Sequence, residues 1–494
     1  MERQHLKRAT LRGGLAKVAS QGTNVLIRIG ALVVFARLLD PIDFGLIGMV
    51  TAVTGVLGLL RDFGLSAATV QRASITDAQM SALFWFNILV GVVLWVASTL
   101  VAPVMAWFYH ESRLVLITVV LTVGFVFNAA SVQHNALLQR QMRFGTLALI
   151  DLLSLLISTG VGLAMAALGF GYWALVGWSV ALPLANCIAV WVASRWVPGL
   201  PKREASVRPM LRFGGLVTLN TLVAQVAYNL DKVLVGRVWG ATVLGIYGRA
   251  YQLTNMATDN MMTAIGSVAF PALARVQGDR AHLESLFLKG YKLVLTMAFP
   301  VAVMCILFPE DIVAVLLGPK WTEVAPVLRL SSPLIAIYAI INPPGWLLYS
   351  LGRVGRSLKI ALVILPVVAT GYIAGLPYGA SGVAAGYTIA MALWVYPHLV
   401  WCTRETTLSA WKLLRISKTP AAASVVAAAA AYGAHLTVGG IAPLARLFVE
   451  GLVLSGAYVL VSLWAREERS FYANLLRSLR TAGAEIEAPR PGAA

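Results

Sequence analysis

Charged side chains are scarce in this sequence. Only 12% of its 494 residues are Asp, Glu, Lys or Arg, and its mean hydropathy is +0.78. A soluble chain of this length needs a charged surface, and this composition does not supply one. Since an apolar run of about 20 residues can cross a bilayer as a helix, the sequence predicts an all-α polytopic membrane protein.

Cysteines and catalytic motifs are also few. Cys187, Cys305 and Cys402 stand singly, with no CxxC pair, and are interpreted as packing residues. The sequence contains no HExxH, no GxSxG, no phosphate-binding glycine loop and no acidic cluster suited to a metal. The loops between the apolar runs are too short for a folded catalytic domain. We therefore expect a protein that is not an enzyme and that has no cofactor and no metal site.

The apolar runs predict the number of membrane crossings. We expect fourteen transmembrane helices, at 18–38, 43–61, 82–108, 114–138, 145–168, 172–194, 213–236, 243–270, 288–308, 326–351, 358–376, 380–402, 420–440 and 444–465.

The basic residues predict the orientation of these helices. With the N-terminus inside, the inside segments hold 29 of the 39 lysines and arginines, and the outside loops hold five. Cytoplasmic loops collect Lys and Arg, so both termini are predicted to be cytoplasmic. The net charge of +18 then indicates contact with anionic lipid headgroups and not with nucleic acid.

An internal repeat is the next feature of the sequence. A shift of 200 residues places Arg37 on Arg237, Gly45 on Gly245 and Gly48 on Gly248, and a shift of 210 places Arg143 on Arg353. Six predicted helices precede each midpoint, so the halves are expected to be parallel repeats, a recurring transporter design. The predicted parts are an N-terminal six-helix lobe (1–194), a basic cytoplasmic linker (195–212), a C-terminal six-helix lobe (213–402), two accessory helices (403–465) and a cytoplasmic tail (466–494).

Polar residues inside the predicted helices are the candidate functional groups, because they are costly in a membrane. They recur at three- and four-residue spacing on the first, seventh and eighth helices, so that each set shares one helix face. The predicted substrate-binding residues are Gln21, Asn24, Arg28, Gln225, Tyr228, Lys232, Arg249, Tyr251, Gln252 and Asn255. Asp259 and Asp231 are the predicted ion-coupling residues.

Two interpretations of these polar faces remain open. They can hold helices together by hydrogen bonding, or they can line a central cavity between the lobes. In the second case Arg28, Lys232 and Arg249 outnumber Asp231 and Asp259, which makes the cavity slightly basic. A basic cavity rich in hydrogen-bonding groups suits an anionic, polyhydroxylated substrate.

Several segments resemble a known family. These are Phe35 to Gly45 (FARLLDPIDFG), Gln133 to Phe144 (QHNALLQRQMRF), Asn229 to Lys232 (NLDK) and Tyr247 to Tyr251 (YGRAY). Together with the repeat, they are similar to the polysaccharide-transporter family of Wzx-type oligosaccharide flippases. The similarity covers roughly residues 10 to 410 and is greatest to the branch that includes the colanic-acid exporter. This family shares a superfamily with the multidrug and toxin extruders and the lipid II flippase.

The resemblance implies a function. Members translocate an undecaprenyl-diphosphate-linked oligosaccharide repeat unit across the bacterial inner membrane, for exopolysaccharide or lipopolysaccharide biosynthesis. The implied mechanism is alternating access of the two lobes, coupled to a cation gradient. The implied partners are the lipid-linked oligosaccharide, the bilayer, a polysaccharide polymerase and the export machinery. No cofactor is implied.

Two other functions compete with this one. The first is a multidrug or cation antiporter of the same superfamily, against which the basic character of the predicted cavity counts. The second is a membrane-embedded polymerase or glycosyltransferase. That function requires a large outside loop or an acidic catalytic pair near an interface, and the sequence shows neither.

Overall fold

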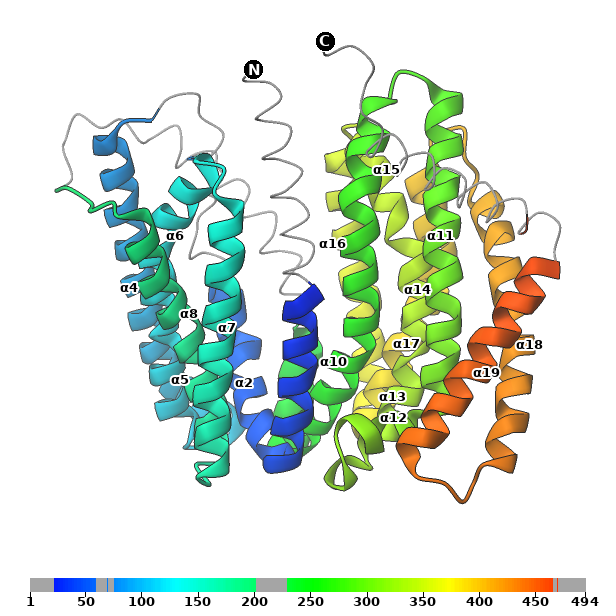
Figure 1. Ribbon diagram of the computed structural model, residues 1–494, viewed down its shortest axis with the longest axis horizontal. Helices are drawn as coiled ribbons and strands as arrows, with labels where there is room; N and C mark the ends of the chain where they lie inside the picture. The colour runs from blue at the N-terminus through cyan, green and yellow to red at the C-terminus, as the bar shows by residue number, and fades with distance from the viewer. Residues whose placement is uncertain (1–21, 59–68, 70–74, 201–228, 465–468, 470–494) are drawn as a thin grey trace, which may run out of the picture. The chain divides into compact units, whose positions relative to one another are not determined.

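The computed structural model describes residues 22–58, 69, 75–200, 229–464 and 469 of the chain. These residues are almost entirely helical and include no β-strand (Figure 1), which confirms the predicted all-α class. Among them, nine helical segments are long and apolar enough to cross a membrane. The count of fourteen helices and the cytoplasmic placement of both termini remain predictions.

The helices of the first half lie at the predicted apolar runs. They are a helix over 22–38, α2 (Pro41–Gly58), α4 (Asp77–Tyr109), α5 (Leu114–Thr122), α6 (Gly124–Arg140), α7 (Phe144–Ala167) and α8 (Tyr172–Ser194). Local signals set some of their ends. The side chain of Thr76 accepts from the backbone N–H of Gln79, and the Gln79 side chain accepts from the backbone N–H of Thr76. This capping box fixes the start of α4.

The second half begins with a long helical run that is interrupted once. Within α10 (Leu230–Arg275), Gly240 has φ 78° and ψ −175°, a left-handed-side conformation that glycine adopts without steric cost. This break falls between the two spans predicted at 213–236 and 243–270. The first of these spans lies largely outside the described residues. The break at Gly240 therefore agrees with a turn between the two predicted spans, although the structure describes mainly the span that follows it.

The remaining helices follow in order. They are α11 (Arg280–Leu307), α12 (Pro309–Leu316), the short 3₁₀ turn η1 (Pro319–Trp321), α13 (Val324–Ser331), α14 (Pro333–Ile341), α15 (Pro343–Ser350), α16 (Val354–Gly375), the turn η2 (Leu376–Tyr378), α17 (Gly379–Thr403), α18 (Ala410–Thr437) and α19 (Pro443–Trp464). Several begin before the predicted apolar run because the helix continues into polar sequence. Thus α11 begins at Arg280 rather than near residue 288, and α18 begins at Ala410 rather than near residue 420.

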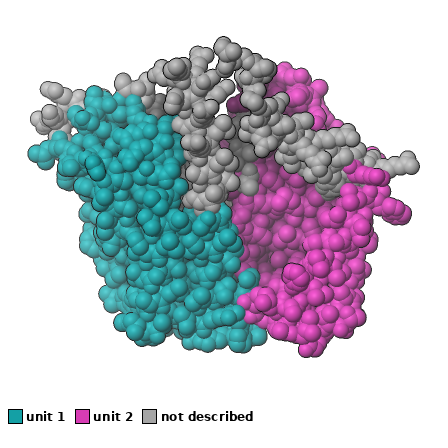
Figure 2. All heavy atoms as spheres, viewed as in Figure 1, with its two compact units in different colours: residues 1–251, 316–327, 361–390 teal, residues 252–315, 328–360, 391–494 magenta. Residues whose placement is uncertain are grey.

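The chain forms two compact units (Figure 2). Unit 1 comprises residues 1–251, 316–327 and 361–390, and unit 2 comprises residues 252–315, 328–360 and 391–494. A large apolar cluster among the described residues of unit 2 packs α11 against α14, α18 and the end of α17, around the buried side chains of Tyr291 and Phe287. These units follow contacts rather than sequence order, so the division into lobes at 195–212 remains a prediction.

The same arginine contact occurs once in each half of the sequence. The Nη1 atom of Arg143 donates to the carbonyl of Ala193, 3.0 Å away, at the end of α8. The Nη1 atom of Arg353 donates to the carbonyl of Arg404, 2.9 Å away, just after α17. The residue before each arginine has a positive φ, 56° and 70°. The recurrence of this local geometry at a shift of 210 residues supports the internal duplication.

The second arginine contact continues into the loop after α17. Arg356 donates to Oε2 of Glu405 at 2.9 Å. This hydrogen bond to the carboxylate holds the pKa of Glu405 below its ordinary value. The two arginines thus fix the loop between α17 and α18 on the turn between α15 and α16.

Two glycines that correspond under the repeat lie in the same helix crossing of unit 1. A Cβ added to Gly45 in α2 would overlap the carbonyl oxygen of Ala241, and one added to Gly245 in α10 would overlap that of Pro41. Since 41 and 241 correspond under the same shift of 200, each half makes the same contact with the other. The absence of a side chain at both positions lets the two backbones touch.

A second crossing depends on glycine in the same way. A Cβ at Gly382 or Gly386 of α17 would overlap the carbonyl oxygen of Gly375 or Gly371 in α16. The GxxxG spacing at 382–386 therefore serves helix packing in this chain.

The segment 316–327 belongs to unit 1 although it is far away in sequence from most of that unit. Trp321 is fully buried, and its Nε1 donates to the carbonyl of Ala36 at 2.7 Å. Lys320 forms an ion pair with Asp40 at 2.7 Å. Both segments are predicted to lie at the outer surface of the membrane, so their contact supports the predicted alternation of the loops.

Candidate functional site

The structure describes nine of the twelve predicted site residues. Gln21, Gln225 and Tyr228 lie outside the described residues. The others fall on the helix over 22–38 (Asn24 and Arg28) and on α10 (Asp231, Lys232, Arg249, Tyr251, Gln252, Asn255 and Asp259). Those up to Tyr251 belong to unit 1, and the last three belong to unit 2.

Asp231 is the most enclosed of the predicted residues. Its side chain has no exposed surface, and its Oδ2 accepts a hydrogen bond from the Tyr247 hydroxyl at 2.8 Å. Its other oxygen, Oδ1, has no hydrogen-bond partner among the described residues. Tyr247 follows the Gly240 break in α10, so the kink returns the chain to place a donor over this carboxylate. A buried carboxylate with a free oxygen is able to accept a proton or a cation.

Lys232 does not pair with its neighbour Asp231. Its Nζ donates to Oδ1 of Asn229 at 3.0 Å, one turn earlier on the same segment. Adjacent helical residues point about 100° apart, which explains this choice of partner. Lys232 is half-buried. It therefore places a positive charge beside Asp231 without forming a hydrogen bond to that carboxylate.

Arg249 contacts an aromatic ring. Its guanidinium carbon lies 4.1 Å from the centroid of the Phe44 ring, a cation–π geometry. The Phe44 ring also meets the edge of Trp321 at 5.2 Å. This contact joins α10 to the start of α2 and to η1 within unit 1.

Tyr251 belongs to a run of four tyrosine rings from three helices. It stacks on Tyr247 with centroids 5.7 Å apart and lies 6.1 Å from Tyr387, which in turn stacks on Tyr372 at 4.9 Å. All four are buried. The run fixes α10 against α16 and α17, and it supports the position of the Tyr247 hydroxyl over Asp231.

Arg28 and Asn24 stand apart from this cluster. Arg28 is exposed, and it makes no hydrogen bond or ion pair with any residue that the structure describes. Asn24 is half-buried, and its Oδ1 lacks a hydrogen-bond partner among the same residues. The structure therefore does not join these two residues to the Asp231 cluster, but it leaves both with polar atoms to offer a ligand.

The predicted residues in unit 2 follow on α10. Gln252 and Asp259 are exposed, and Asn255 is half-buried. Asp259 forms no ion pair with the other residues that the structure describes in unit 2. Of the two predicted ion-coupling residues, Asp231 is therefore the enclosed one and Asp259 the accessible one.

Comparison with known proteins identifies the family. The polysaccharide biosynthesis protein family matches residues 34–326, more than half of the chain. The chain belongs to this family. The match confirms the resemblance that the Phe35–Gly45, Gln133–Phe144 and NLDK segments indicate.

Named relatives of this family member act in polysaccharide biosynthesis. It is 27% identical over 400 residues to the lipopolysaccharide biosynthesis protein WzxC of Escherichia coli (strain K12), covering 78% of this chain and 80% of the relative. It is 29% identical over 297 residues to the teichuronic acid biosynthesis protein TuaB of Bacillus subtilis (strain 168), covering 60% and 62%. It is 22% identical over 349 residues to the succinoglycan biosynthesis transport protein ExoT of Rhizobium meliloti (strain 1021), covering 70% and 69%.

Solved structures show the fold of this family member. The lipid II flippase MurJ in an inward closed conformation matches with a TM-score of 0.74 and 13% identity, over 94% of this chain and all of that one. An inward-facing multidrug transporter of the MATE family matches with a TM-score of 0.61 and 16% identity, over 80% and 96%. The chain thus has the fold of these two structures. Its nine apolar helical segments among the described residues agree with the predicted multi-pass membrane protein.

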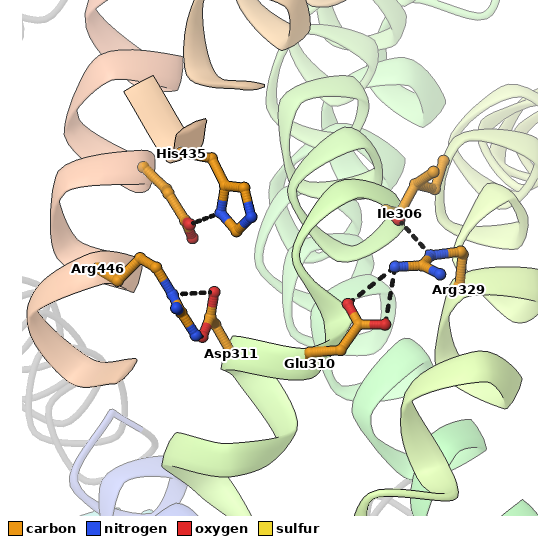
Figure 3. A network of polar contacts seen from close by, with 7 residues as sticks. Ile306, Glu310, Asp311, Arg329, His435 and Arg446 are labelled. Atoms are coloured by element: carbon orange, nitrogen blue, oxygen red, sulfur yellow. Dashed lines mark hydrogen bonds and ion pairs between the residues drawn. The ribbon is translucent and has the colours of Figure 1, made fainter. Parts of the chain in front are cut away.

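Sequence reasoning missed one polar cluster. In unit 2, Asp311, His435, Arg446 and Glu450 meet from three helices, and Asp311 and Glu450 are buried (Figure 3). One signal was available, since Glu450 is an acidic residue inside the apolar run predicted at 444–465. Its partners are separated from one another by up to 135 residues, so spacing alone could not group them.

Proposed function

We propose that this protein is a flippase that moves a polyprenyl-diphosphate-linked oligosaccharide across the bacterial inner membrane by alternating access. The observation that carries the proposal is the family match over residues 34–326. The relatives are named for lipopolysaccharide, teichuronic acid and succinoglycan. The fold shared with a lipid II flippase suits a lipid-linked substrate of this kind.

The chemistry of the predicted residues fits such a substrate. A diphosphate needs cationic partners, and arginine is the best because its planar guanidinium donates two parallel hydrogen bonds. Arg28 is exposed and is available for this role. Lys232 adds a half-buried positive charge, and the amide groups of Asn24, Gln252 and Asn255 offer hydrogen bonds to sugar hydroxyls.

The position of Tyr251 bears on its proposed role. Tyr251 was predicted to bind sugar, but its ring is buried between Tyr247 and Tyr387. We propose that Tyr251 positions the Asp231–Tyr247 pair, while sugar contacts come from the exposed amides.

We further propose that a cation gradient drives the transport and that Asp231 binds the ion. Asp231 is fully buried and retains one oxygen without a described hydrogen-bond partner, whereas Asp259 is exposed. Flipping by reconstituted wild type should respond to an imposed pH or sodium gradient. In Asp231→Asn that response should be lost, and in Asp259→Asn it should remain. The reverse pattern would assign the ion to Asp259.

A test in cells addresses the substrate class. Deleting the gene should remove a surface polysaccharide and leave its lipid-linked repeat unit on the cytoplasmic face, and a plasmid copy should restore export. The main alternative is a multidrug antiporter, whose fold the chain also shares. If deletion instead sensitises cells to cationic dyes and leaves the surface polysaccharide intact, the flippase proposal is wrong.

A further inference from the structure

Four charged or titratable side chains of unit 2 converge where the α18–α19 hairpin meets α12. Asp311 lies in the first turn of α12, His435 in the last turn of α18, and Arg446 and Glu450 near the start of α19. Figure 3 shows Asp311 facing Arg446, with His435 above them on the same side of α12. Nothing in the flippase proposal uses these residues.

One carboxylate of this cluster is already neutralised. Arg446 contacts both oxygens of Asp311, with Nε donating to Oδ2 at 2.8 Å and Nη2 donating to Oδ1. Such two-point contacts between guanidinium and carboxylate are the strong form of this pair. Asp311 is 2% exposed, so this carboxylate is held away from solvent, whereas the Arg446 side chain is 22% exposed. The pair adds no net charge to the cluster.

The other carboxylate has a single described partner. Glu450 has no exposed surface, and its Oε1 lies 2.6 Å from Nδ1 of His435. Its Oε2 has no hydrogen-bond partner among the described residues. Burying an ionised carboxylate without a counter-charge is costly, so the His435–Glu450 pair must hold one proton between its two groups.

The surroundings of His435 favour a positive charge on the ring. The centroid of its ring lies 5.4 Å from that of Phe308 and 6.0 Å from that of Tyr432, and aromatic faces attract cations. It also lies at the C-terminal end of α18, where the helix dipole favours a cation. The side chain of His435 is 33% exposed while that of Glu450 is fully buried, so a proton has a route to the pair through the imidazole.

The charge count decides which ligand the cluster suits. Two carboxylates and one guanidinium leave one negative charge, which a single proton balances. A divalent metal would leave an excess positive charge, and it would compete with Arg446 for Asp311. The neighbouring charges do not alter this count, because Glu310 accepts from Arg329 at 2.8 and 2.9 Å and both are exposed.

We propose that His435 and Glu450 form a proton-binding site that holds the α18–α19 hairpin on α12. The protonated pair is neutral and closes the contact. Loss of the proton leaves a buried negative charge, which weakens the contact and loosens the hairpin. This inference concerns the folded chain and does not depend on the substrate.

Hydrogen–deuterium exchange of the purified full chain tests the site. The segment 436–448, which spans the turn between α18 and α19, should be protected at mildly acidic pH. After correction for the intrinsic exchange rate, this protection should fall at mildly alkaline pH, because deprotonation destabilises the closed contact. In Glu450→Gln the change with pH should be lost, since a glutamine amide needs no counter-charge.

The control is Glu310→Gln, one residue from Asp311, which removes an exposed pair and should keep the wild-type pH response. His435→Arg supplies a permanent positive charge and should keep the segment protected at both pH values, so it tests the site even if Glu450→Gln fails to fold. An identical pH response in Glu450→Gln and Glu310→Gln would overturn the proposal. So would protection that depends on added Zn²⁺ and on Glu450, since it would identify a metal site.

Discussion

Arg28 and Arg249 show how two arginines of one candidate site differ. Arg249 is held against the Phe44 ring, whereas Arg28 is exposed and makes no hydrogen bond or ion pair with the described residues. An arginine inside an apolar helix is unfavourable unless it faces water, a ligand or a polar partner, and the described residues offer Arg28 no such partner. We therefore assign the diphosphate contact to Arg28 and a supporting role to Arg249.

Arg28→Ala should reduce export of the surface polysaccharide by about ten- to a hundredfold, because a hydrogen bond to a charged group contributes about 1.5–3 kcal/mol. Arg28→Lys should restore export only in part, since an ammonium cannot make the two-point contact. The measurement is surface polysaccharide per unit of membrane-inserted protein. Arg113→Ala is the control, because Arg113 is bound to Glu111 in an exposed turn. If Arg28→Ala depletes the protein from the membrane, the residue is structural.

At the scale of elements, the crossing of α2 and α10 is the contact that most clearly reflects the repeat. Gly45 and Gly245 each touch a backbone carbonyl of the other half within unit 1. Gly248 lies three residues along α10, and no atom outside its own helix lies within 4 Å of a Cβ built there. Gly245 and Gly248 therefore form a matched pair of positions on α10. A side chain at Gly245 would overlap a neighbouring backbone, and one at Gly248 would not.

Gly245→Ala should destabilise the protein by about 1–3 kcal/mol, the usual cost of forcing extra volume into a close contact. Gly248→Ala should be neutral or slightly stabilising, because alanine favours the helix. Thermal unfolding in detergent measures both. Equal unfolding temperatures for the two variants would contradict the close crossing.

The elements also show what could be read from sequence. Apolar runs located most of the described helices, because a membrane-spanning helix must be apolar over most of its length. The short helix α12 lies between two predicted runs and was not expected. The paired contacts between distant segments could not be found this way. Trp321 donates to Ala36 across 285 residues, and Arg446 to Asp311 across 135. Each partner looks ordinary in its own segment, and only the fold brings them together.

The burial of the candidate site residues could not be read from sequence for the same reason. The spacing of polar residues placed them on one face of α10, where Asp231 accepts from Tyr247 and Lys232 donates to Asn229. It did not show that the Tyr251 ring is buried or that Asp259 is exposed. Burial depends on neighbouring helices, and helical periodicity describes only one helix at a time.

At the scale of the whole molecule, orientation in the membrane is the first property to measure. Reporter fusions should place the 195–212 linker, the 403–418 loop and the C-terminus in the cytoplasm, because these segments are rich in Lys and Arg. A fusion in the segment 309–325, which contains α12 and η1, should report from the outer side. A periplasmic signal from any of the first three would contradict the fourteen-helix arrangement.

The central claim is that the protein moves a lipid-linked oligosaccharide between leaflets. The direct measurement uses liposomes that contain a fluorescent undecaprenyl-diphosphate-linked oligosaccharide and a quencher that cannot cross the membrane. With wild-type protein, nearly all of the fluorescence should be quenched over time. With empty liposomes, only the fluorescence of the outer-leaflet half should be quenched. With Arg28→Ala, quenching of the remaining half should be about ten- to a hundredfold slower than with wild type. If wild type quenches no more than empty liposomes while it transports a cationic dye in parallel vesicles, the protein is a cation transporter and not a flippase.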